Sequence, residues 1–140
     1  MKYLLDTCLI SELVRPKPDP QVTAWVSACD EDQLYLSVLT LGEIQKGISK
    51  LQDVTRKDKL QHWLDRDLMS RFRNRILNIC ENVSLTWGVI QGEAESKGIV
   101  ISSIDGLIGA TGVAHNLTVA TRNEKDILPT GVNIINPWHI

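Results

Sequence analysis

The sequence predicts an α/β protein, a three-layer α/β/α sandwich with a mainly parallel central sheet. Short apolar runs of strand length alternate along the chain with longer segments whose apolar residues recur at helical spacing. The first run, at residues 2–5, is followed at once by a helical segment, as is usual where helices cover both faces of a sheet. We expect residues 1–140 to form one domain with its own core.

The first half of the chain is expected to hold two strands and four helices. Runs at residues 2–5 and 34–37 have the length and composition of buried strands. Alternate prolines from Pro16 to Pro20 separate the first two helices, because such a segment cannot continue a helix. The expected helices span residues 8–14, 20–28, 41–51 and 55–72, and the last two could form a protruding pair.

The second half continues the alternation. Strands are expected at residues 76–79, 117–120 and 132–135, with a turn and a helical stub over 121–126. One helix should begin at 81 or 82, reach 97 and end at Gly98, since glycine is favoured just beyond a helix. The next should follow Ser102-Ser103, which would cap it. Its glycines Gly106, Gly109 and Gly112 would allow close packing, so we expect it to be buried.

The composition says more about where in the cell the protein works than about what it binds. Three widely spaced cysteines without a CxxC pair argue against a disulfide framework or a thiolate metal site. No apolar run approaches the about 18 residues that span a bilayer. We therefore expect a cytoplasmic protein. A net charge of −2 neither favours nor excludes a nucleic-acid partner.

Acidic side chains follow several of the predicted strands. Three of them come after strands: Asp6, the region of Glu43, and the pair Asn123/Asp126. They should therefore meet at one edge of a parallel sheet. Asp105, in the first turn of its helix, could face the same edge. Helix capping is the alternative explanation for each. Asp6 can cap the first helix, Thr40 to Glu43 matches a capping box, Asn123 to Asp126 resembles one, and Asp105 favours the helix dipole.

Convergence of these acids would need a cation. Carboxylates in one crevice repel each other unless a positive ion neutralises them. Oxygen ligands without a cysteine or histidine cluster select Mg²⁺ or Mn²⁺. Such a site suits phosphoryl chemistry, in which the metal activates water.

Several segments, in the same order along the chain, resemble a PIN domain, and more narrowly the VapC/FitB-type toxins of bacterial toxin–antitoxin pairs. They are Leu5-Asp6-Thr7, Glu43 in the third helix, Ser103 to Thr111, Val119 to Asp126, and Ile135-Asn136-Pro137-Trp138. One departure is Ile127, where the family often has Phe. The resemblance covers nearly the whole chain.

The resemblance implies a Mg²⁺-dependent endoribonuclease, the toxin of a type II toxin–antitoxin system, with Mn²⁺ as a possible substitute. Metal-activated water would hydrolyse RNA phosphodiester bonds. Asp6 and Asp105 would be the principal metal ligands and Glu43 would complete the acidic cluster; the fourth catalytic position stays open between Asp126 and Asn123. The implied partners are RNA, a second copy in a homodimer, and a cognate antitoxin whose tail occupies the acidic groove.

Other polar residues are expected to support this site. Thr7 and Ser103 could orient metal ligands through their hydroxyl groups, although helix capping alone also explains such residues. Thr121 and Asn123 are the supporting candidates in the later motif. The candidates for RNA backbone contacts are Lys46, Lys50, Arg71, Arg73, Arg75 and Arg122. For the arginines between 71 and 75, a solvated helix end is the competing interpretation.

Two other classes of function remain to be compared. A degenerate PIN-like domain that binds RNA or protein without catalysis would lack metal-dependent turnover. A haloacid-dehalogenase-like phosphatase needs a second Asp two residues after the first, where this chain has Cys8. His62, His115 and His139 are dispersed, whereas a histidine acid–base ribonuclease needs two imidazoles beside one phosphate.

Overall fold

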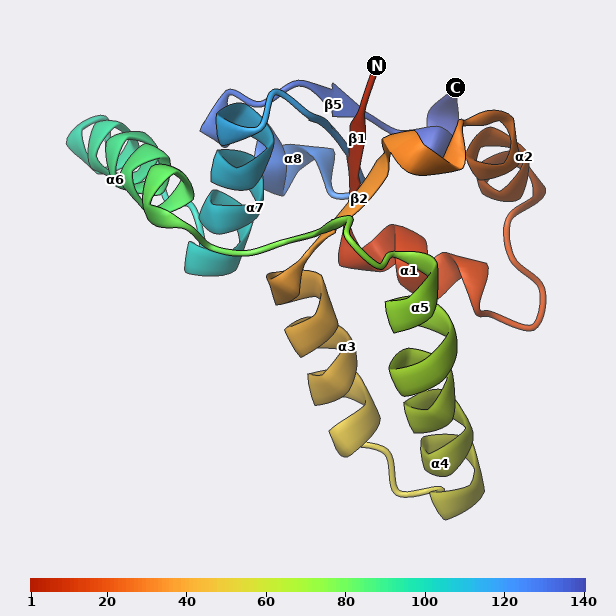
Figure 1. Ribbon diagram of the computed structural model, residues 1–140. Helices are drawn as coiled ribbons and strands as arrows, with labels where there is room; N and C mark the ends of the chain where they lie inside the picture. Colours follow the sequence, from red (N-terminus) through yellow and green to blue (C-terminus); the bar gives the residue numbers. More distant parts are fainter.

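Five parallel strands lie between two layers of helices in the computed structural model, which describes residues 1–140 (Figure 1). The order across the sheet is β3-β2-β1-β4-β5, and each neighbouring pair is parallel. The strands are β1 (Tyr3–Leu5), β2 (Leu34–Ser37), β3 (Ile76–Leu77), β4 (Thr118–Ala120) and β5 (Ile134–Ile135). The predicted α/β class is confirmed, and the sheet is parallel throughout.

The central strand β1 is buried on both faces. Successive side chains of a strand point to opposite faces, so Leu5 joins the larger of two core clusters and Leu4 the smaller one. Val119 and Ala120 of β4 divide between the clusters in the same way. This double burial explains why β1 is a continuous apolar run in the sequence rather than an alternation of apolar and polar residues.

The larger cluster lies under the helices of the first half of the chain. They are α1 (Thr7–Leu13), α2 (Pro20–Ala28), α3 (Val38–Ser49), α4 (Val54–His62), the π-helical segment η2 (Trp63–Leu68) and α5 (Met69–Arg71). The last three follow one another without a break and form the long helix predicted at 55–72, with Leu64 and Leu68 of η2 buried. In Figure 1, α3 and α4 project together away from the sheet, which confirms the predicted helical pair.

The smaller cluster lies under α7 (Ser103–Ala114) and α8 (Glu124–Ile127), and α6 (Glu81–Ser96) packs against α7 farther from the sheet (Figure 1). Gly98 follows α6 with φ +71°, so the predicted helix end is confirmed. Three short 3-10 turns complete the chain: η1 (Glu31–Gln33), η3 (Leu128–Thr130) and η4 (Pro137–His139). No helix is long and apolar enough to cross a bilayer.

Neither of the two capping boxes that were the alternative explanation for Glu43 and for Asn123/Asp126 is formed. Helix α3 begins directly after β2, and its cap is Ser37, whose hydroxyl accepts a hydrogen bond from the Leu39 amide. Thr40 and Glu43 therefore lie inside the helix rather than at its start. At α8, the Asn123 side chain makes no capping hydrogen bond. Because these residues do not cap helices, their side chains are available for other contacts.

Glycines allow α7 to approach its neighbours closely, as predicted. A Cβ atom at Gly109 would lie 2.3 Å from Oγ1 and 2.4 Å from Cβ of Thr130 in η3. A Cβ atom at Gly112 would lie 2.6 Å from a methyl group of Val132. These distances are too short for any larger residue, so the glycines set the spacing between α7 and the segment before β5.

Replacement of Gly109 tests this packing. Gly109→Ala should lower the free energy of unfolding by about 1–3 kcal/mol, because Thr130 and its backbone must move. The matched variant Gly92→Ala, in α6, places its Cβ where no atom lies within 4 Å and should be neutral or stabilising by about 0.4–1 kcal/mol. Urea unfolding followed by circular dichroism measures both. Equal effects would show that close packing of α7 does not require glycine.

Candidate active site

Asp6 stands at the carboxyl end of β1, where its amide donates to the Ala120 carbonyl of β4 at 3.0 Å. One side-chain oxygen, Oδ1, accepts a hydrogen bond from the Thr7 amide at 2.9 Å and so caps α1. The other, Oδ2, accepts one from the Thr121 hydroxyl at 2.7 Å. The residue is only 6% exposed. Capping is therefore confirmed, but it occupies only one of the two oxygens.

The surroundings of Asp6 favour a neutralising cation. Burial raises the pKa of its carboxyl group, hydrogen bonds from Thr121 and Thr7 lower it, and the negative charge of Asp105 raises it again. The net pKa is above the ordinary value. Neither Asp6, Glu43 nor Asp105 forms an ion pair with a lysine or arginine in this structure. A cation placed here would remove both the desolvation cost and the repulsion.

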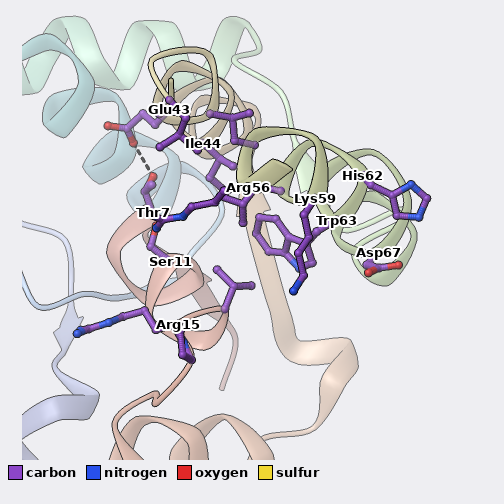
Figure 2. A pocket seen from close by; sticks show the side chains of 16 residues that line it. Thr7, Ser11, Arg15, Glu43, Ile44, Arg56, Lys59, His62, Trp63 and Asp67 are labelled. Atoms are coloured by element: carbon purple, nitrogen blue, oxygen red, sulfur yellow. Dashed lines mark hydrogen bonds between the residues drawn. The ribbon is translucent and has the colours of Figure 1, made fainter. Parts of the chain in front are cut away.

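Thr7 connects Asp6 to Glu43. Its amide binds Asp6, and its hydroxyl donates to Oε1 of Glu43 on α3 at 2.6 Å, as the dashed line in Figure 2 shows. The same hydroxyl lies 3.3 Å from that of Thr40, which is fully buried. Helices α1 and α3 therefore bring a second carboxylate toward the end of β1. The sequence missed Thr40, because its position suggested a helix cap.

Asp105 lies in the first turn of α7 and is half-buried. The hydroxyl of Ser102, the N-cap residue, accepts a hydrogen bond from the Asp105 amide at 3.2 Å and donates one to its Oδ2 at 2.8 Å. Ser103, the serine expected to support the site, makes no such bond. The expectation was off by one residue, since the helix begins at Ser103 and the capping position is the residue before it.

The two candidates for the fourth position lie on the loop after β4 and the short helix α8. Asn123 and Asp126 are both exposed, and neither side chain is hydrogen-bonded to Asp6, Glu43 or Asp105. Asn123 is linked to the site through its backbone, whose amide donates to the Thr121 hydroxyl at 2.9 Å. Thr121 therefore organises both the buried acid and the loop that carries these two candidates.

Cys8 is a neighbour of Asp6 that the sequence did not suggest. Its sulfur lies 3.8 Å from Oδ2 of Asp6 and 3.5 Å from the Thr121 hydroxyl. Burial raises the pKa of the Cys8 thiol, and the charge of Asp6 adds to the rise, so the group stays protonated at neutral pH. The one available signal was its position two residues after Asp6, at the start of a helix.

A groove of about 1080 Å³ opens beside Glu43, between α1, α3, α4 and η2 (Figure 2). Thr7 and Glu43 lie in its wall together with apolar residues such as Ile44, Ile48 and Trp63. The cationic side chains Arg15, Arg56 and Lys59 line it too, as does His62. Lys46 and Lys50 are exposed and do not line the groove, although they lie on the same helix as Glu43.

The arginines after η2 do not form a free basic strip. Arg71 and Arg75 each form an ion pair with Glu31 at 2.9 Å, and Arg75 also donates to the Leu34 carbonyl at 2.7 Å. These contacts fasten the end of the long helix to the start of β2. Arg73 is exposed and makes no ion pair. Two of the three arginines thus have a structural role.

Comparison with known proteins identifies the family. Residues 3–128 match the PIN domain. The chain belongs to the PIN-domain family. It is 37% identical over 136 residues to Toxin FitB of Neisseria gonorrhoeae, and the alignment covers 97% of this chain and 98% of that protein. It is 36% identical over 135 residues to VapC ribonuclease Y4jK of Sinorhizobium fredii, which covers 96% of both.

A solved structure agrees with this assignment. The crystal structure of FitAcB from Neisseria gonorrhoeae superposes with a TM-score of 0.93 at 36% identity and covers 99% of both chains. The prediction of a VapC/FitB-type ribonuclease toxin of a type II toxin–antitoxin system is confirmed by these relatives.

PIN-domain ribonucleases are typically metal-dependent, and the donor chemistry here suits a hard cation. No three His, Cys, Asp or Glu side chains lie close enough together to hold a metal ion between them. Mg²⁺ usually keeps several waters and binds through only one or two carboxylates. The pair Asp6 and Asp105, whose charges lie close enough to affect the pKa of Asp6, is therefore compatible with that ion.

The Glu31 ion pairs predict a pH-dependent contribution to stability. The largest effect on the pKa of Glu31 is the hydrogen bond from Arg71, which lowers it. Burial raises this pKa, and the hydrogen bond from Arg75 lowers it further. Because the folded pKa lies below the ordinary value of 4.5, the stabilisation is present above about pH 4.5 and is lost as the pH falls through the folded pKa. Glu31→Gln should therefore be less stable than the unmodified protein at pH 7, and this difference should be smaller at pH 3.

The expected difference at pH 7 is below about 1 kcal/mol, since the Glu31 side chain is 50% exposed and solvent screens the pair. Thermal melts at the two pH values measure it. Glu95→Gln, on the exposed surface of α6, removes a charge without an ion pair and serves as the control. A Glu31→Gln deficit that is as large at pH 3 as at pH 7 would contradict the assignment.

Proposed function

We propose that this chain is a Mg²⁺-dependent endoribonuclease whose active site is the crevice around Asp6, Glu43 and Asp105. The observation that carries the proposal is the buried carboxylate of Asp6, which is held by Thr7 and Thr121 beside two other acids without a cationic partner. In this proposal residues 1–140 act as one domain, and the site of action is the cytosol, where RNA is present.

Asp6 and Asp105 would hold the ion, and Mn²⁺ could replace Mg²⁺. When bound, the ion would lower the pKa of a water molecule and stabilise negative charge on the phosphate. The Thr121 hydroxyl fixes Oδ2 of Asp6, and the Ser102 hydroxyl fixes Oδ2 of Asp105, so both carboxylates are oriented before substrate arrives.

Glu43 would act as the base that takes a proton from the attacking water. Its Oε1 accepts a hydrogen bond from Thr7, whereas its Oε2 makes no hydrogen bond within the chain and is free to accept that proton. The fourth member is a choice between Asn123 and Asp126, both of which are exposed beside the site and accessible to RNA. We propose Lys46, Lys50 and Arg73, which are exposed, as weaker contacts to the RNA backbone.

The groove beside Glu43 suits the proposed antitoxin segment. Its apolar wall of Ile44, Ile48 and Trp63 would take the apolar face of an amphipathic helix. Arg56 and Lys59, which form no ion pairs, would face acidic side chains of that helix, and Glu43 would face a basic one. The solved structure of VapBC2 from Rickettsia felis bound to a promoter DNA fragment, 26% identical with a TM-score of 0.81, supports an antitoxin partner for this fold.

A homodimer is also part of the proposal. Exposed apolar side chains gather on α6 and the segment after it: Leu85 is 72% exposed, Val89, one turn later, is 60% exposed, and Val100 is 94% exposed. A second copy of the chain would cover this surface. The alternative function, a PIN-like binding domain without catalysis, is disfavoured because the acids that catalysis needs are all present.

Cleavage assays test the proposed active site. Asp6→Asn and Asp105→Asn should each lower the rate of RNA cleavage by at least about 100-fold, because each removes charge from the proposed metal site without changing side-chain shape. EDTA should abolish cleavage, and added Mg²⁺ should restore it. Asp58→Asn, an exposed residue of α4 that forms no ion pair, is the matched control and should cleave at the normal rate.

Cleavage that persists in EDTA, or in the Asp6→Asn variant, would reject a metal-dependent mechanism. The same assay addresses the fourth position. A loss in Asp126→Asn without one in Asn123→Ala would assign the role to Asp126, and the reverse pattern would assign it to Asn123.

Charge reversal tests the groove. Arg56→Glu combined with Lys59→Glu should weaken binding of the coexpressed cognate antitoxin by at least about 10-fold, because two cations that face the segment become anions. Arg66→Glu, on the neighbouring segment but outside the groove, should bind normally. Isothermal titration calorimetry compares the variants. Equal affinities in all three proteins would place the antitoxin elsewhere.

A further inference from the structure

An arginine lies stacked on a tryptophan beside the acidic crevice. The guanidinium of Arg122, in the loop after β4, lies 5.0 Å from the ring centroid of Trp138 in the C-terminal turn η4. Arg122 is exposed and forms no ion pair in this structure. One face of the guanidinium is therefore covered by the indole, while its N–H groups have no carboxylate partner.

Trp138 is a fixed platform rather than a mobile surface residue. It is half-buried and packs against the larger core cluster. Its backbone amide donates to the side chain of Asn136 at 3.0 Å, and Asn136 in turn donates to Glu124 of α8 at 2.8 Å. The indole also contacts Glu12 of α1, which is only 4% exposed. These contacts fix the backbone of η4 and hold the indole of Trp138 against α1.

Arg122 is linked to Asp6 through two neighbouring residues, Thr121 and Cys8. It follows Thr121, whose hydroxyl holds the Asp6 carboxylate. The Arg122 amide donates to the sulfur of Cys8 at 3.5 Å, and that sulfur lies 3.8 Å from Oδ2 of Asp6. The charge of Arg122 partly offsets the rise that burial and Asp6 cause in the pKa of the Cys8 thiol. The cation is thus close to the rim of the crevice.

We infer that Arg122 binds a phosphate of the RNA backbone next to the one that is cleaved, and that Trp138 is a positioning residue that holds the guanidinium in place. This inference rests on the proposed ribonuclease function. An acidic crevice repels RNA, so a fixed cation at its rim would offset that repulsion during binding.

Arginine suits this task better than lysine. Its planar group can stack on the indole while two N–H groups bind one phosphate, whereas an ammonium group offers neither geometry. Stacking also removes conformational freedom before RNA arrives, so less entropy is lost on binding. A phosphate is favoured over an acidic antitoxin side chain because Arg122 follows Thr121 and its amide contacts Cys8, both neighbours of Asp6, where the proposed reaction brings the RNA backbone.

The test compares four variants: Arg122→Gln, Arg122→Lys, Trp138→Met and Trp138→Phe. Arg122→Gln should raise KM for a short RNA about 10-fold with little change in kcat, because it removes a charge-assisted contact to substrate. The slope of log KM against log salt should fall by about 0.7, the value for one phosphate contact on a single strand. Arg122→Lys should recover only part of this loss.

Trp138→Met keeps an apolar side chain but removes the aromatic face, so it should raise KM in the same direction as Arg122→Gln. Trp138→Phe keeps one aromatic ring for the guanidinium but loses the second ring and the N–H of the indole, so its KM should lie between those of the unmodified protein and Trp138→Met. A merely structural role of Trp138 would instead lower stability without a change in the salt slope. Should Trp138→Met fail to fold, Trp138→Phe combined with Arg122→Lys gives a second comparison, in which the stacked pair is weakened from both sides.

RNA binding measured without cleavage separates this inference from the proposed function. Fluorescence anisotropy with the same RNA, on Asp6→Asn protein in EDTA, reports the Arg122 contact whether or not the chain is a nuclease. Reduced affinity and a smaller salt slope in Arg122→Gln support the inference even if cleavage is absent. Unchanged affinity and slope overturn it, as does a loss confined to binding of the coexpressed antitoxin.

Discussion

The hydrogen bond from the Thr121 hydroxyl to Asp6 is the contact on which the site depends. Parallel pairing sets Leu5 of β1 opposite Ala120 of β4, so the next residues, Asp6 and Thr121, leave the sheet side by side. A carboxylate buried in this way is costly unless polar groups satisfy it. Thr121 and the Thr7 amide do so at 2.7 and 2.9 Å, and they leave the group oriented toward the crevice.

The same few residues join the two halves of the proposed function. Thr7 bonds to Asp6 through its amide and to Glu43 through its hydroxyl, and it also lines the groove between α1, α3 and α4. A segment bound in that groove would therefore touch the residues that hold the catalytic acids. Chemistry and inhibition would be coupled through direct contact, without a conformational change between distant sites.

Local sequence patterns were sufficient for most of the elements and for the position of Asp6 at the end of β1, but not for contacts between distant segments. Residues 20–28 and 34–37 were predicted with the observed bounds, because turn residues and apolar runs mark them locally. The pairs Arg71–Glu31 and Arg122–Trp138 join segments that only the sheet order brings together. Ser102 was missed in favour of Ser103, since a cap is defined by backbone geometry that propensities locate only within a residue or two.

Direct metal binding tests the central claim, that Asp6 is a ligand oriented by Thr121. The measurement is isothermal titration of Mn²⁺ into the unmodified protein, Asp6→Asn and Thr121→Val. The account predicts saturable binding that is lost in Asp6→Asn and weakened about 10- to 100-fold in Thr121→Val, which lacks the orienting hydroxyl. Equal Mn²⁺ affinity in the unmodified protein and Asp6→Asn would contradict it.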